Sequence, residues 1–373
     1  MNRKRSSLRS ALLPLAAGAA LVAPALASGC GGGLDAISKV DGLRVLAVTV
    51  TEPGHPEVGK SYADPGESVT FAMFHEDGFV DPKNPDAVRP LQIVWLGGCE
   101  DPAGDAYYGC YQSLGPTLAK LSGLKAGDPL PPEIGIGDSY TVTLTPEIIS
   151  RRPIPIPPEG TPYGIAYVFF AACAGFLGPV AADSTGGAGA FPIGCFADAA
   201  HTVRLGPESF VPGYTQIYSF KGGRTNADPP VQALTFDTKD RGEGPGNALK
   251  IKVCAVDDDT RTAPASCTKQ DPFTTCTPIN VDITVDASVA EVDPDGVSES
   301  GQPLKEVVWV DYFADKGDFD SDVRLVSDAT TGLIADHSTN WIAPTEPGLV
   351  TVTAVVHDAR GGATVLQRFI SVE

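Results

Sequence analysis

The chain has 373 residues, and its 46 acidic and 27 basic side chains give a formal net charge of −19. Such a surface repels phosphate backbones, which argues against nucleic-acid binding. The 41 glycines and 33 prolines, beside only two methionines, indicate many short strands joined by turns rather than a helical protein.

The N-terminal segment has the three parts of an export signal. A basic stretch at residues 3–5 precedes an apolar run over residues 11–27, which is short for a membrane helix and contains two prolines. Small residues then lead to a cysteine, in the order Leu26-Ala27-Ser28-Gly29-Cys30. We therefore expect residues 1–29 to be a signal peptide. An ordinary signal peptide cut near Ala27, with Cys30 a free thiol, is the alternative.

This ending resembles the lipobox of bacterial lipoproteins, in which the peptidase cuts before the Cys and its sulfur carries a diacylglycerol. The resemblance implies lipidation of Cys30 and anchoring in the lipid bilayer through several acyl chains. Ala27 stands where the family prefers Leu. The family keeps proteins with Asp after the Cys at the inner membrane, so Gly31 implies sorting to the outer membrane. Residues 30–40, in which Gly31–Gly33 follow Cys30, are expected to form a flexible tether.

The first half of the body, residues 41–220, contains apolar runs with period-2 alternation that are bounded by Gly, Pro and Asp. This pattern predicts β-strands. The predicted strands are Leu43–Val50, Ser68–Phe74, Leu91–Leu96, Tyr140–Thr145 and Tyr163–Cys173. The last is the most apolar and is expected to be central, and long insertions separate several of these strands.

Residues 221–230 have the composition of a linker, and the strand pattern then restarts over residues 231–373. The predicted strands are Val231–Phe236, Leu249–Cys254, Ile279–Val285, Glu306–Phe313, Thr339–Trp341, Leu349–Val356 and Ala363–Val372. Asp358–Gly362 predicts a hairpin turn between the last two. Each half has one Trp on a middle strand, Trp95 and Trp309. We therefore expect an all-β protein of two tandem Ig-like β-sandwich domains, with both Trp side chains between the sheets.

The segment from Trp341 to Gly362 resembles the close of PKD-like and other bacterial Ig-like domains. The opening LRVLAV, the PGESVTF turn, the Trp-Leu-Gly-Gly-Cys stretch and the PESFVPGY segment resemble myxobacterial-type envelope lipoproteins. The resemblance implies the fold and an envelope location, and it implies no activity.

Eight cysteines are present, and lipidation of Cys30 would leave seven. The exported compartment permits disulfides. Close spacing favours the pairs Cys99–Cys110, Cys173–Cys195 and Cys267–Cys276, with Cys254 left over, although spacing does not determine connectivity. No Cys-x-x-Cys pair supports the rival interpretation, a metal site.

The most distinctive acidic cluster has carboxylates at alternate positions, namely Asp318, Asp320 and Asp322. In a curved loop such side chains can converge on one calcium ion, but Val323 stands where an EF-hand needs Gly. A solvated acidic loop is the alternative. We expect no other cofactor.

Three tyrosines, Tyr107, Tyr108 and Tyr111, lie close to Cys99 and Cys110 in the first insertion. Their rings predict either a glycan-binding surface on a disulfide-held loop or an insertion that packs its own side chains. The five histidines match no hydrolase motif, so we do not expect an enzyme. The leading hypothesis is a non-catalytic binding or scaffolding protein of the envelope with an unknown protein partner. A surface adhesin or glycan-binding module that calcium would stiffen is the alternative.

Overall fold

A computed structural model describes the body of the chain from Ser38 to Glu373. The ranges that it describes are residues 38–81, 83–84, 87–111, 114–117, 128–152, 161–180, 193–256, 272–298 and 300–373. The predicted signal peptide, Cys30 and most of the tether therefore lie outside the described residues. Within the described ranges, no helix is long and apolar enough to cross a membrane.

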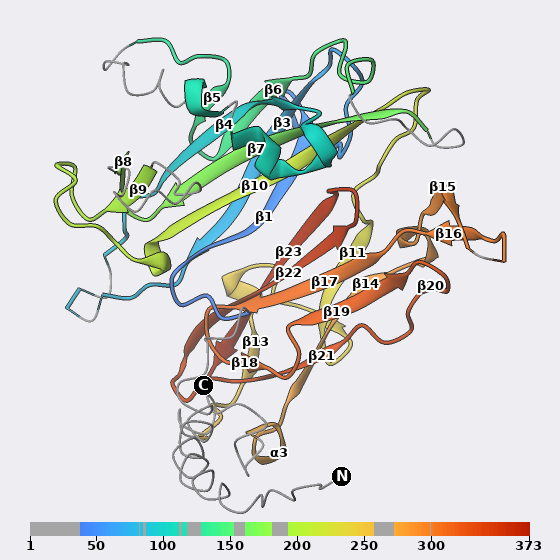
Figure 1. Ribbon diagram of the computed structural model, residues 1–373. Helices are drawn as coiled ribbons and strands as arrows, with labels where there is room; N and C mark the ends of the chain where they lie inside the picture. The colour runs from blue at the N-terminus through green and yellow to red at the C-terminus, as the bar shows by residue number, and fades with distance from the viewer. Residues whose placement is uncertain are drawn as a thin grey trace, which may run out of the picture.

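Two β-sandwiches follow one another along the chain, the first in blue to yellow-green and the second in yellow to red (Figure 1). The first consists of the four-stranded sheets β2-β1-β3-β6 and β10-β7-β4-β5. This arrangement matches the A-B-E and G-F-C-C′ sheets of an Ig-like domain. Its strands are β1 (Leu43–Glu52), β2 (His55–Gly59), β3 (Ser68–Asp77), β4 (Gln92–Glu100), β5 (Ile134–Ile136), β6 (Ser139–Thr143), β7 (Tyr163–Cys173) and β10 (Phe210–Phe220), and β8 (Phe176–Pro179) and β9 (Ile193–Phe196) form a separate hairpin.

The second sandwich has a five-stranded sheet, β12-β11-β14-β21-β18, and a six-stranded sheet, β13-β23-β22-β17-β19-β20. The order again follows the Ig-like pattern, and β13 pairs in parallel with the last strand. The strands are β11 (Val231–Phe236), β12 (Lys239–Asp240), β13 (Leu249–Ile251), β14 (Ile279–Val285), β17 (Val308–Ala314), β18 (Asp318–Phe319), β19 (Val323–Asp328), β20 (Gly332–Leu333), β21 (Thr339–Ile342), β22 (Gly348–Asp358) and β23 (Ala363–Val372), and β15 (Val292–Val297) and β16 (Pro303–Lys305) form a small hairpin.

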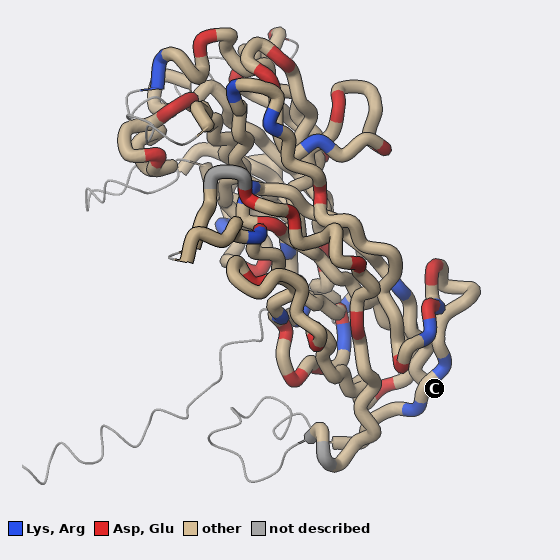
Figure 2. The backbone as a smooth tube through the Cα atoms, turned by 90° about the vertical axis from the view of Figure 1, so that its right-hand side faces the viewer, with Lys and Arg blue, Asp and Glu red and all other residues tan. Residues whose placement is uncertain are grey.

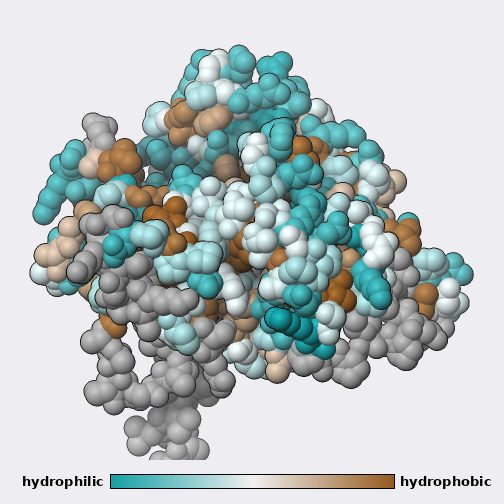
Figure 3. Space-filling view, turned by 90° about the horizontal axis from the view of Figure 1, so that it is seen from above, coloured by the Kyte–Doolittle hydropathy of each residue, from teal (hydrophilic) through white to brown (hydrophobic). Residues whose placement is uncertain are grey.

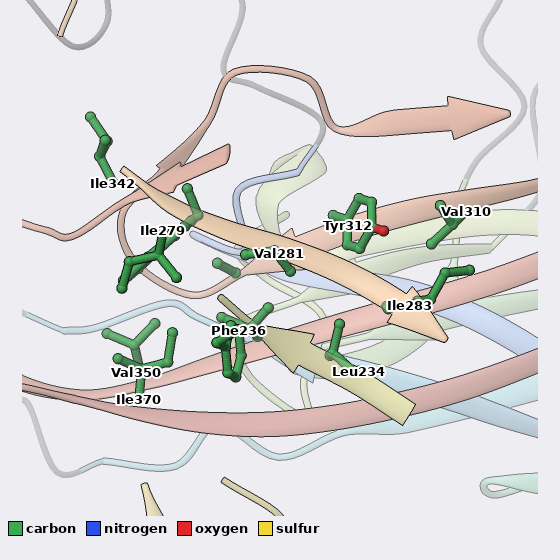
Figure 4. Packing of buried hydrophobic residues seen from close by; sticks show 14 of the residues in the cluster. Leu234, Phe236, Ile279, Val281, Ile283, Val310, Tyr312, Ile342, Val350 and Ile370 are labelled. Atoms are coloured by element: carbon green, nitrogen blue, oxygen red, sulfur yellow. The ribbon is translucent and has the colours of Figure 1, made fainter. Parts of the chain in front are cut away.

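Each sandwich has its own hydrophobic core, which the inward residues of both sheets form. Strand β7 is buried along nearly its whole length, because a further apolar cluster covers the outer face of its sheet. In the second sandwich, Leu234 and Phe236 of one sheet pack with Val350 and Ile370 of the other (Figure 4). Trp95 on β4 is fully buried between the sheets of the first sandwich, as expected. Its ring contacts Phe170 and Tyr140, with centroids 5.7 and 6.4 Å away.

The expectation that Trp309 fills the second core is wrong. Trp309 alternates with the buried Val308 and Val310 on β17, so its side chain points away from the core. There it stacks on His357, with centroids 5.3 Å apart. The buried tryptophan of this sandwich is Trp341 on β21, whose indole N–H donates to the Lys316 carbonyl at 3.2 Å.

The two sandwiches share an interface on the outer face of the six-stranded sheet. The segment before β1 joins β17, since the Val40 N–H donates to the Ala314 carbonyl and the Ala314 N–H to the Ser38 carbonyl, both at 2.9 Å. The Gln367 amide donates to the Glu76 carboxylate at 2.6 Å across the same interface. An apolar cluster completes it, formed by Val40, Leu46, Ala47, Phe74, Phe313, Val355 and Val365.

Three disulfides are present among the described cysteines. Cys99–Cys110 and Cys173–Cys195 are the pairs that spacing favours. The third differs from expectation, because Cys254 bonds to Cys276 and is not left over. Cys254 follows β13, which runs beside β23, and so lies at the same end of the sandwich as the start of β14. Cys267 lies outside the described residues.

Candidate functional site

The candidate site is an aromatic surface over the outer face of the sheet β10-β7-β4-β5. Strand β4 ends at Glu100, and Asp101 and Asp105 then adopt positive φ values of 45° and 51°, which turn the chain back over the sheet. Two short 3₁₀ turns follow, Ala103–Asp105 and Tyr107–Cys110. The Cys99–Cys110 disulfide bonds the second turn to the strand from which the loop departs.

The tyrosine surface consists of Tyr107, Tyr108, Tyr111 and Tyr214. Tyr107 is at its centre, stacked on Tyr214 of β10 with ring centroids 4.2 Å apart and an interplanar angle of 17°. The edges of Tyr108 and Tyr111 meet Tyr107, with centroids at 5.8 and 6.1 Å. Tyr108 is 64% exposed, Tyr111 49% and Tyr214 45%, so three rings are available to a partner.

A buried ion-pair network holds the base of this loop. Arg152, whose side chain is 3% exposed, lies 3.6 Å from Asp101 and also pairs with Asp105. The Tyr163 hydroxyl donates to the Asp105 carboxylate at 2.9 Å, and the Tyr167 hydroxyl donates to the Asp105 carbonyl at 2.6 Å. Burial raises the pKa of Asp101, although the Ile165 N–H and Arg152 oppose the change. Moving the loop away from Arg152 would leave buried charges unpaired, which is energetically costly. The network therefore holds the loop in this position.

Two phenol groups at or below the tyrosine surface have raised pKa values. Burial, and then the neighbouring Tyr107 and Tyr214, raises the pKa of Tyr111, and burial raises that of Tyr167 to about 12. A layer of rings on a rigid loop can contact a partner through ring faces and hydroxyl groups. The structure therefore packs Tyr107 on β10 and leaves Tyr108 and Tyr111 exposed.

The predicted calcium ligands are not gathered into one site. Among the residues that the structure describes, no group of three or more His, Cys, Asp or Glu side chains is placed to hold a metal ion. The Asp320 carboxylate instead accepts hydrogen bonds from Asn340 N and Nδ2, at 3.0 and 2.8 Å, and from Thr339 Oγ1 at 2.8 Å. Although burial opposes it, these bonds lower the pKa of Asp320. Asp318, Asp320 and Asp322 thus do not converge, because the middle carboxylate is turned to β21.

Two histidines of the second sandwich pair with carboxylates. His337 Nδ1 lies 2.7 Å from Asp282, and His357 Nε2 lies 3.2 Å from Asp311. Asp311 also accepts a hydrogen bond from the Trp309 indole at 3.2 Å. In the described part of the chain, neither histidine is hydrogen-bonded to a serine hydroxyl, so neither pair forms a Ser-His-Asp arrangement there.

Acidic residues are distributed over both sandwiches and do not gather on one face (Figure 2). Seen from above, hydrophobic residues form small separate patches in a largely hydrophilic surface (Figure 3). Sequence reasoning found three of the four tyrosines in the tyrosine surface. It missed Tyr214, which is 103 positions beyond Tyr111 and joins them only because β10 pairs with β7.

Comparisons with known proteins add little to this description. No family model and no curated protein matches the chain. One solved structure that it resembles is the D00-D0 domain of Intimin, at 10% identity and a TM-score of 0.21, covering 87% of this chain and 99% of that one. Another is dimeric latent PorU from Porphyromonas gingivalis, at 10% identity and a TM-score of 0.18, covering 90% of this chain and 24% of that one. Likeness at this level supports no functional assignment, so the Ig-like description depends on the strand order.

Proposed function

We propose that this protein is an exported lipoprotein, anchored to the outer membrane through Cys30, that binds another envelope protein and performs no catalysis. The anchor is proposed from the basic, apolar and small-residue order of the N-terminal segment. The binding role is proposed from the body, which consists of two rigid sandwiches with an exposed aromatic loop.

The observation that carries the binding role is the exposure of Tyr108, Tyr111 and Tyr214 on a loop that is held by a disulfide. Tyrosine is enriched in protein interfaces and their hot spots. It offers a large amphipathic contact area for the loss of only two side-chain torsions. Since the loop is already fixed by Cys99–Cys110 and Arg152, binding would order little further chain.

Affinity capture of the full-length lipidated protein from crosslinked envelopes tests this proposal. We expect one near-stoichiometric protein partner, whose affinity falls at least tenfold in the Tyr108→Ala and Tyr111→Ala variants, as for hot-spot residues. Val297→Ala is the matched control, because Val297 is 68% exposed on the other sandwich. A partner that binds all three variants as tightly as the wild type would refute the assignment of this surface.

A glycan is the second candidate ligand, since the same exposed rings could stack on sugar faces. If a glycan is the ligand, the protein should be retained on an immobilised neutral glycan, and substitution of Tyr108 or Tyr111 should abolish the retention. The capture experiment should then enrich no protein partner. The net charge of −19 disfavours an anionic glycan.

A further inference from the structure

The point at which the anchor would join the body is fixed in the structure. Ser38 is 4% exposed, and its carbonyl accepts the Ala314 N–H of the second sandwich. Ser38 is eight residues from Cys30, so a fully extended tether spans at most about 28 Å. A lipid on Cys30 would therefore keep the surface around Ser38 close to the bilayer.

An exposed loop, residues 78–91, begins beside that point. Gly78 donates its N–H to the Gly42 carbonyl at 3.2 Å. It also packs so closely on Val40 that an added Cβ would lie 1.7 Å from the Val40 carbonyl oxygen. Glycine is required here because any side chain would collide with the backbone of the entering chain. The loop and the end of the tether thus lie side by side.

The loop presents apolar side chains to solvent. Phe79 is 39% exposed, Val80 58% and Val88 93%. Exposed hydrophobic side chains gathered on one loop are a common feature of membrane contact sites. Two contacts join described residues of the loop, since Asp81 and Asn84 form a bridge and the Ala87 N–H donates to the Asn84 carbonyl at 3.0 Å.

Arg89 holds this loop against the first sandwich. Its guanidinium pairs with Asp77, with Nε 2.7 Å from Oδ2, and donates to Ser209 Oγ at 2.6 Å. The same group lies over the Phe79 ring, 4.3 Å from its centroid. Phe79 is therefore fixed on one side while the rest of its surface stays open. A hollow of about 580 Å³ beside the loop is lined by Phe79, Val80 and Val88. Its charged lining residues are Glu76, Asp77, Arg89, Asp315 and Lys316, the last two from the second sandwich.

We propose that Phe79, Val80 and Val88 dock on the surface of a neutral phospholipid bilayer and so set the orientation of the anchored protein. The occupant is a neutral bilayer because the chain carries a net charge of −19, which an anionic surface repels. Covalent anchoring supplies the affinity, and the apolar loop selects which face of the two sandwiches meets the lipid. This inference rests on the proposed lipidation of Cys30.

Tryptophan placed in the loop measures the contact directly. The full lipidated chain is reconstituted in phosphatidylcholine vesicles, with and without brominated acyl chains, after mass spectrometry has verified the lipid on Cys30. For Phe79→Trp we expect a blue-shifted emission and at least twofold quenching by the brominated lipid, taken as the difference from wild type. Val88→Trp is expected to behave in the same way, and its 93% exposure makes it a substitution that cannot disturb packing.

Val297→Trp is the matched control, because Val297 is 68% exposed on β15, away from the start of β1 (Figure 1). It should keep a water-exposed emission without quenching. Water-exposed emission from both loop variants in lipidated protein would overturn the docking and leave the anchor intact. A Cys30 peptide without lipid would overturn the anchor and the docking together.

Discussion

Raising the pH is expected to destabilise the second sandwich through one buried carboxyl group. The Glu306 side chain is 4% exposed and lies 2.7 Å from Arg360, which also contacts Glu291. Burial, followed by the nearby Asp358 carboxylate, raises the pKa of Glu306 from 4.5 to about 7 despite this ion pair. The folded chain therefore binds a proton at Glu306 that the unfolded chain has released. Its contribution to stability is complete below pH 4.5 and is lost as the pH rises through 7.

The shift in the pKa of Glu306 gives the size of the effect. A difference between 4.5 and 7 corresponds to about 3 kcal/mol in the free energy of unfolding between pH 4.5 and pH 8. Burial also raises the pKa of Glu76, Asp228 and Asp315, so the wild type has a further slope of the same sign. The contribution of Glu306 to the pH dependence is therefore the difference in slope between the wild type and Glu306→Gln.

Urea unfolding followed by circular dichroism at pH 4.5 and pH 8 measures this difference. The amide of Glu306→Gln cannot ionise, so we expect the variant to lose about 3 kcal/mol of the pH dependence. Val297→Ala is the control, because it changes an exposed side chain of the same sandwich and removes no ionisable group, so it should keep the wild-type slope. Equal slopes for the wild type and Glu306→Gln would contradict the argument.

Three further predictions concern the second sandwich. Replacing Cys254 and Cys276 together with Ala should lower the free energy of unfolding by about 3 kcal/mol, since the bond closes a loop of 22 residues; a non-reduced peptide map that joins Cys276 to any other cysteine would contradict the pairing. Trp341→Ala should cost about 3–5 kcal/mol because the ring is fully buried, whereas Trp309→Ala should cost about 1–2 kcal/mol because its ring lies outside the core; chemical denaturation with equal losses would disprove the assignment. Asp320→Ala should lower the melting temperature through the loss of three accepted hydrogen bonds, and millimolar calcium should leave the wild-type melting curve unchanged; a calcium-dependent rise would restore the metal hypothesis.

The strand pattern could be predicted from the local order of apolar and polar residues. Period-2 alternation placed β1, β3 and β14 close to their observed ends, because inward residues of a two-layer sandwich must be apolar. A continuous apolar run placed β7, which is buried along nearly its whole length. Neither pattern revealed β10, since Pro212 and Gly213 interrupt the apolar run. Proline is tolerated there because β10 is at the edge of its sheet, where one side needs no ladder partner.

Which side chains contact one another depends on how the strands and sandwiches pack. The alternation on β17 indicates that Trp309 and Val308 point to opposite faces of the sheet. It does not indicate that the other sandwich packs near the face of Trp309. Spacing could not choose Cys254 over Cys267 as the partner of Cys276, since the choice depends on how β13 pairs with β23. Tyr214 joins the tyrosine surface through strand pairing alone. Local patterns indicate which residues are buried, whereas contacts between distant segments depend on sheet order and domain packing.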